Sequence, residues 1–260
     1  MRCGSNNHNL TILNLNGCSA LKELDCSISN LPSLDVLEFS NLEKLNCSHA
    51  FDGNKVNPIL NLSSCTNLNT LKCSGTKFGE SYFNETLSNF TKLEVLGCGF
   101  MDLGYLDLTN NTALKEVDCS YNWLASLKLP SSVPNLEKLC CHRNSLYEED
   151  IDDIVSKLPD RRNTAESGFF SVYYSYKDGY NEGNVCTTQH VSDAWEKNWK
   201  TYQTADNINF TLYEGATVPT AISTMEAGVD DDAPRYNMSG QRVGHNYKGI
   251  VIVNGRKVLK

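Results

Sequence analysis

A six-residue pattern, L-x-x-L-x-C, occurs six times between residues 21 and 141, once with Val as its second apolar residue. The pattern ends at Cys26, Cys47, Cys73, Cys98, Cys119 and Cys141, which are separated by 21, 26, 25, 21 and 22 residues. A fixed period of this length is typical of a solenoid, in which each repeat is one structural unit stacked on the next. This period constrains the fold more strongly than any other feature of the sequence.

Each repeat predicts a short strand whose Leu and Cys point inward while the residues between them point outward. Stacked repeats place these strands about 4.8 Å apart and share one elongated core. A second apolar pair follows each strand, as in Leu34/Leu37 and Leu106/Leu108. Two insertions, at 50–58 and 77–85, account for the longer steps. The spacing resembles that of leucine-rich repeats, so the predicted fold class is an α/β solenoid over residues 1–145, with a parallel β-sheet on its concave face.

The cysteines could instead form disulfides or hold a metal. Eleven cysteines cannot pair completely within one chain. Cysteines stacked in register are close enough for a bridge, but their side chains run parallel and do not face one another. The regular spacing supplies no close pair such as C-x₂-C, and neighbours such as Cys140 and Cys141 point to opposite faces of a strand. Free, buried thiols are the favoured interpretation, with a disulfide or a metal as the alternatives.

Over residues 10–146, the repeats resemble the cysteine-ladder repeats of internalin-type bacterial surface proteins. The resemblance lies in L-x-x-L-x-C followed by a pattern such as L-x-L-x-x-N-T-x-L, and the two insertions are its main departures. It implies a curved, non-enzymatic surface for adhesion or for binding a protein or glycan. The alternative is a structural spacer that presents another domain or the tail at the cell surface.

Residues 146–203 differ in pattern from the repeats. Apolar residues at helical spacing predict a helix over 146–159, and the aromatic and β-branched run at 169–176 predicts a strand. A second helix is expected from Thr188, followed by a strand around Trp199–Tyr202. An open solenoid end leaves core and strand edges bare, so this segment is interpreted as a helix–strand C-terminal cap.

The remaining chain reads as a linker and a tail. Residues 204–234 are mostly small, polar and acidic, which favours a linker. Residues 235–260 predict a small C-terminal β unit of three strands, with a hairpin turn at Asn254-Gly255. This tail resembles the sorting or anchoring segments of secreted Gram-negative bacterial proteins. It implies a secreted or cell-surface protein whose signal peptide is absent from this chain, since the first residues lack a hydrophobic segment.

Several functional classes find no support in the sequence. The five histidines are scattered, and no catalytic or phosphate-binding motif occurs, so we expect neither an enzyme nor a cofactor or metal site. A net charge of −8 argues against nucleic acid as a partner. No apolar run is long enough for a membrane-spanning segment.

The outward positions of the repeat strands carry the best candidates for partner binding. Their aromatic, histidine and arginine residues lie on different coils, at the same offset from the motif cysteine or next to it: His49, Phe100, Tyr121, His142 and Arg143. Aromatic and arginine side chains dominate binding hot spots, so this cluster is the predicted contact site. One alternative is that Phe100 only covers Gly97 and Gly99. The second candidate location for the binding site is the pair of insertions at 50–58 and 77–85.

Overall fold

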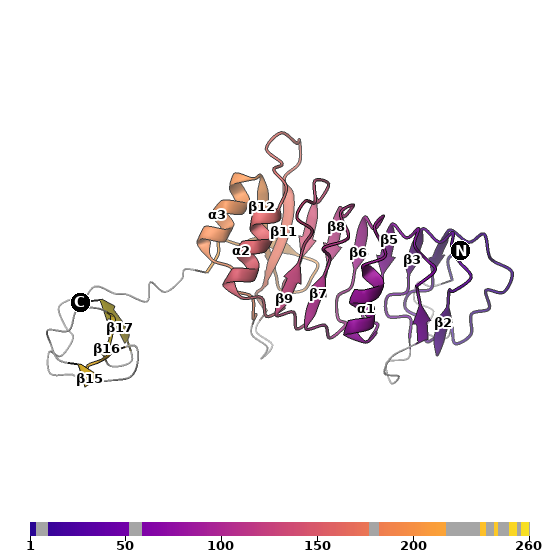
Figure 1. The fold of residues 1–260 in the computed structure, drawn as a ribbon, viewed down its shortest axis with the longest axis horizontal. Coiled ribbons are helices and arrows are strands. Elements are labelled where there is room, and N and C mark those ends of the chain that lie inside the picture. The colour runs from indigo at the N-terminus through magenta and orange to yellow at the C-terminus, as the bar shows by residue number, and fades with distance from the viewer. Residues whose placement is uncertain are drawn as a thin grey trace. The chain divides into compact units, whose positions relative to one another are not determined.

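The computed structural model describes residues 1–3, 10–51, 59–176 and 182–216, and four strands of the tail at 235–237, 242–243, 250–253 and 256–259. The chain divides into two compact units, Met1–Gly215 and Ala216–Lys260. The first unit is a solenoid whose coils succeed one another in chain order (Figure 1).

The solenoid is built on a nine-stranded sheet that lines its concave face. Its strands, in sheet order, are β1 (Glu23–Asp25), β3 (Lys44–Asn46), β5 (Thr70–Lys72), β6 (Val95–Gly97), β8 (Glu116–Asp118), β10 (Lys138–Cys140), β11 (Gly168–Tyr174), β12 (Trp199–Thr204) and β13 (Phe210–Leu212). All pairs are parallel except β12–β13. The repeat strands pair without slippage from β1 to β10, because equivalent Leu and Val residues pack inward in one row. The predicted solenoid with a parallel concave sheet is confirmed.

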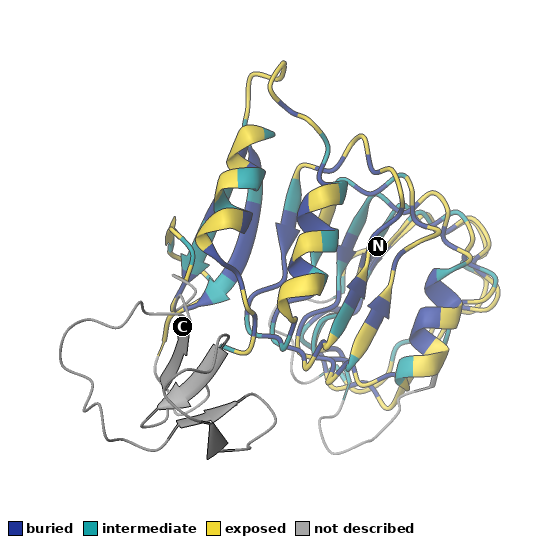
Figure 2. Cartoon of the chain, turned by 60° about the vertical axis from the view of Figure 1, so that its left-hand side comes forward, coloured by how far each residue is buried: buried dark blue, intermediate teal, exposed yellow. Residues whose placement is uncertain are grey.

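The opposite layer alternates with these strands along the chain. It holds two short parallel sheets and three helices: β2 (Ser33–Asp35) with β4 (Ile59–Asn61), α1 (Glu80–Leu87), β7 (Tyr105–Asp107) with β9 (Ser126–Lys128), α2 (Glu148–Lys157) and α3 (Thr188–Glu196). The helices bury the side that faces the sheet and expose the other (Figure 2). One expected pair was wrong: Leu37 is 45% exposed, and Val36 is the buried partner of Leu34, because strand alternation has a period of two.

The motif cysteines Cys26, Cys47, Cys73, Cys98, Cys119 and Cys141, called here the cysteine ladder, are fully buried, and all six are free thiols. Burial raises the pKa of Cys26 to about 12 and that of the other five well above the usual thiol range. The thiolate is the reactive form, so these sulfurs are protected both by packing and by protonation.

A thiol-specific reagent applied to the native protein at pH 8 should therefore label Cys3 and Cys18 quickly, since both are only partly buried. The cysteine ladder should react only after unfolding, when all eleven cysteines become accessible. Mass spectrometry of the labelled peptides measures this order. Rapid labelling of any ladder cysteine in the folded chain would contradict the packing.

Buried asparagines join neighbouring coils next to the ladder. Asn122 accepts from the backbone N–H groups of Met101 and Leu103, at 2.9 and 3.2 Å, and donates to the carbonyl oxygens of Cys98 and Cys119, both at 3.0 Å. Asn144 and Asn184 repeat this arrangement on the following coils. The turns would otherwise bury unpaired backbone groups, so these amides hold the stack together.

The cap continues the solenoid with longer coils. The predicted order of helix, strand, helix and strand is confirmed as α2, β11, α3 and β12. Trp199 on β12 is fully buried, and a Cβ at Gly168 would overlap its ring, which explains a glycine at that position. We expected a linker from residue 204, but the chain returns as β13 and covers the edge of β12, and the unit extends to Gly215.

The tail forms its own antiparallel sheet in the order β15-β14-β16-β17. Its described strands are β14 (Arg235–Asn237), β15 (Arg242–Val243), β16 (Ile250–Val253) and β17 (Arg256–Leu259). Val253 pairs with Arg256, so the two strands expected to form a hairpin are paired antiparallel; the turn residues Asn254 and Gly255 lie outside the described residues. The segment expected to give one strand before this hairpin gives two, β14 and β15, so the sheet has four described strands instead of three.

Candidate binding site at one edge of the concave sheet

The second residue after each ladder cysteine has a left-handed backbone, with φ between 50° and 72°. This left-handed row consists of Ile28, His49, Gly75, Phe100, Tyr121 and Arg143. A left-handed backbone costs a residue other than glycine about 1–2 kcal/mol, because its Cβ approaches the following carbonyl oxygen. Glycine occupies the row only at Gly75, so the fold accepts glycine there while the other coils keep a side chain.

Side chains of the row stack on one another just beyond the C-terminal ends of the concave strands, the edge of the sheet meant here. The rings of Phe100 and Tyr121 lie 4.2 Å apart at an interplanar angle of 18°. The Arg143 guanidinium lies 5.1 Å from the centroid of Tyr121 and 4.6 Å from that of Tyr174, as a cation–π contact requires. The structure therefore brings Phe100, Tyr121 and Arg143 together, as the sequence predicted, and adds Tyr174. These four residues are called here the edge cluster.

His49 lies at the end of the edge cluster, with its ring 6.4 Å from that of Phe100. The intervening coil has Gly75, and a Cβ there would overlap the His49 imidazole. His49 thus reaches toward the cluster across a position without a side chain. Phe100 stacks on Tyr121 and remains 44% exposed, so its ring is available at the surface.

His142 differs from its predicted outward placement, because it is fully buried. Its Nδ1 lies 3.0 Å from Ser171 Oγ, and its ring contacts those of Tyr121, Tyr174 and Phe210. Burial lowers the pKa of His142 to about 4, so the imidazole is neutral at pH 7. Phe210 comes from the segment that returns after β12, which sequence position alone could not place over β10.

A cavity of about 600 Å³, called here the edge cavity, opens beside the edge cluster. Besides these four residues, it is lined by Lys77, Asp102, Asn122, Trp123, Asn144 and Ser145. Lys77 Nζ and an Asp102 carboxylate oxygen form an ion pair at 2.6 Å, and Trp123 is 59% exposed. Sequence reasoning missed Trp123, which lies two residues beyond Tyr121 of the left-handed row, in the connection between β8 and β9.

Glu182 fixes the cap end of this site. Its carboxylate accepts from the backbone N–H groups of Arg143, Tyr174, Asn144 and Asn184 at 2.6–3.2 Å. Burial raises the pKa of Glu182 above its usual value, and these four hydrogen bonds oppose that rise. Glu182 therefore holds the backbone on which Arg143 and Tyr174 present their side chains, a role that the sequence did not indicate.

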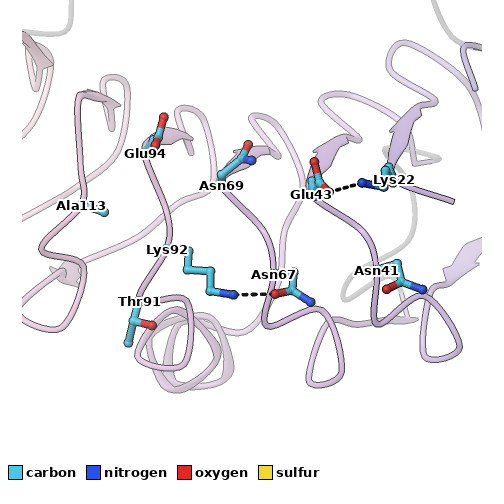
Figure 3. A pocket seen from close by; sticks show the side chains of 9 residues that line it. All are labelled: Lys22, Asn41, Glu43, Asn67, Asn69, Thr91, Lys92, Glu94 and Ala113. Atoms are coloured by element: carbon cyan, nitrogen blue, oxygen red, sulfur yellow. Dashed lines mark hydrogen bonds and ion pairs between the residues drawn. The ribbon is translucent and has the colours of Figure 1, made fainter. Parts of the chain in front are cut away.

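A second cavity, of about 590 Å³, lies at the opposite ends of the concave strands. Figure 3 shows its side chains on successive coils. Lys22 Nζ donates a hydrogen bond to a Glu43 carboxylate oxygen at 2.8 Å, and Lys92 Nζ donates one to Asn67 Oδ1 at 2.7 Å. The described residues that line this cavity are polar except for Ala113, and none of them is aromatic. Specific ligand pockets usually combine apolar or aromatic walls with a few polar groups, which favours the edge cavity as the candidate site.

Neither a metal cluster nor a membrane-spanning helix is found among the described residues. Among them, no group of three or more His, Cys, Asp or Glu side chains is arranged to hold a metal ion. No helix in this part of the chain has the length and apolar character needed to cross a membrane.

Comparison with known proteins finds similar chains among solved structures. No protein-family model matches the chain, and no curated protein matches it by sequence. Among solved structures, the chain is similar to the functional domain of InlJ from Listeria monocytogenes, described as including a cysteine ladder. The two share 21% sequence identity with a TM-score of 0.42, over 73% of this chain and 46% of the other. The chain thus spans about half the length of that structure.

Proposed function

We propose that this chain is a non-enzymatic recognition module that binds a protein or glycan partner at the edge cluster and edge cavity. The observation that carries the proposal is the left-handed row. Phe100, Tyr121 and Arg143 occupy backbone positions that glycine would accept at lower cost, and strained backbone of this kind clusters at functional sites.

The chemistry of the edge cavity supports recognition. Stacked aromatic rings and an arginine held between them are the residue types that contribute most to binding surfaces. They lose little conformational entropy on binding, because the sheet and the Glu182 hydrogen bonds already fix them. Of the described residues that line the cavity, Asp102 is the single carboxylate, whereas glycoside hydrolysis generally uses a pair.

The same proposal places the protein outside the cell or on its surface, with the tail as a sorting segment. The four-stranded tail sheet belongs to a unit separate from the solenoid, as a segment read by export machinery would be.

Tyr121→Gly should abolish most partner binding while the solenoid stays folded. Glycine fits the left-handed backbone at this position, so the change removes the ring without straining the turn. Arrays of host proteins and glycans, probed with wild type and variant, measure the effect. We expect Tyr121→Gly and Arg143→Ala each to weaken binding by more than about 1 kcal/mol.

Glu23→Ala is the matched control, since Glu23 lies on β1, five strands before β10 in the sheet order. It should bind as wild type does, and circular dichroism should show all three variants folded. Equal losses for Glu23→Ala and Tyr121→Gly would extend the site to the whole concave face. Binding retained by all three variants would move the site to the insertions at 50–58 and 77–85.

A further inference from the structure

We infer that the ligand of the edge cavity is a glycan, with one sugar ring against Trp123 and its hydroxyl groups directed to Asp102, Lys77 and Arg143. This inference rests on the proposed function and specifies the class of partner.

Trp123 supplies the platform for a sugar ring. It lines the edge cavity with 59% of its surface exposed, and its backbone N–H donates to the Leu103 carbonyl oxygen at 2.8 Å, which fixes it to the preceding coil. Among the described residues, no aromatic ring stacks on its indole, whereas Phe100 and Tyr121 cover each other. The indole face carries negative charge density, and the C–H groups on one side of a sugar ring carry the opposite partial charge.

The polar groups around Trp123 match sugar hydroxyls. Asp102 accepts hydrogen bonds, while Lys77 and Arg143 donate them, and Ser145 can do both. Two hydroxyl groups on adjacent carbons of a sugar ring also donate and accept hydrogen bonds. A donor and an acceptor of the protein that lie next to each other can therefore bind the same pair of hydroxyl groups. Asp102 lies outside the left-handed row but also has a left-handed backbone, with φ of 59°. Its carboxylate is therefore held by a backbone conformation that residues other than glycine seldom adopt.

The same part of the fold gives a peptide backbone little to bind. Strands β6, β8 and β10 are each paired on both sides, which leaves no edge for an added strand. Asn122 and Asn144 already bind the turn N–H groups of Met101, Leu103 and Leu124. A helix would need a long apolar groove, but this cavity mixes rings with charged groups and has the volume of a small-ligand site.

A glycan array probed with the full chain and two tryptophan variants tests the inference. Trp123→Ala should lower the affinity for the glycans that wild type binds by at least tenfold. Trp195→Ala is the matched control, because Trp195 is 57% exposed on α3 and lies outside the cavity lining; it should bind within twofold of wild type. Tryptophan fluorescence during titration with the best glycan should change in wild type and Trp195→Ala but not in Trp123→Ala.

The possible failures are distinguishable. Equal glycan binding by wild type and Trp123→Ala would overturn the placement of the sugar. A protein or displayed peptide that binds wild type and loses affinity with Tyr121→Gly, in the absence of any glycan binding, would overturn the glycan class and leave the proposed function standing. Binders of any class that tolerate Tyr121→Gly and Arg143→Ala would overturn the proposed function itself.

Discussion

Asn122→Ala should lower the free energy of unfolding by roughly 3–5 kcal/mol, among the largest effects for a single substitution in this chain. Asn122 is 5% exposed and bonds the backbone of two coils through both atoms of its amide. Alanine would leave the N–H groups of Met101 and Leu103 and the Cys98 carbonyl oxygen buried without this partner, while the Cys119 carbonyl oxygen keeps its hydrogen bond from Asn144. Each such group costs about 1–3 kcal/mol when it stays unpaired, and relaxation of the turn recovers part of the sum.

Urea unfolding of the full chain, followed by circular dichroism, measures this loss. Asn110→Ala is the control, because Asn110 is exposed in a turn of the preceding coil, and its change should stay within about 0.5 kcal/mol. Asn122→Asp should not rescue stability, since it keeps the acceptor but turns an oxygen toward the Cys98 and Cys119 carbonyls. A loss below about 1 kcal/mol for Asn122→Ala would show that water replaces the amide.

Trp199→Ala should also cost roughly 3–5 kcal/mol, because it removes the largest fully buried side chain of the first unit from the end of the core. The indole packs against the Gly168 backbone and donates from Nε1 to the Pro159 carbonyl oxygen at 2.8 Å. Its loss would leave a cavity between β11 and β12 and an unpaired carbonyl. The exposed end of the solenoid should then open before the repeats do.

Hydrogen exchange followed by mass spectrometry distinguishes this local opening from global unfolding. In Trp199→Ala, protection should fall first in β11, β12 and α3 and persist in β3, β5 and β6. Trp195→Ala should leave the pattern unchanged, since Trp195 is mostly exposed. Uniform loss of protection across all the coils would mean that cap and repeats unfold as one unit.

The sequence by itself determined the repeat architecture and the inward direction of the Leu, Val and Cys residues of the repeat motif. Spacing of 21–26 residues between ladder cysteines sets one coil, and a strand period of two sends Leu and Cys inward. The helix and strand order of the cap and the tail hairpin followed from equally local patterns. Among the site residues, the common offset from the cysteine correctly placed Phe100, Tyr121 and Arg143 side by side.

Only the tertiary structure decided what covers each outward residue. His142 directly follows its ladder cysteine, in the same place as residues that were predicted to point outward on the other coils. Tyr174 and Phe210, which come from later segments, nevertheless bury it. Tyr174 and Glu182 complete the site from 31 and 39 residues beyond Arg143, and Trp123 borders a cavity shared by several coils. The local periodicity of the sequence predicts the face on which a side chain lies, because that face depends on backbone geometry alone. Exposure depends on segments brought over that face by the fold, and no local pattern records where they pack.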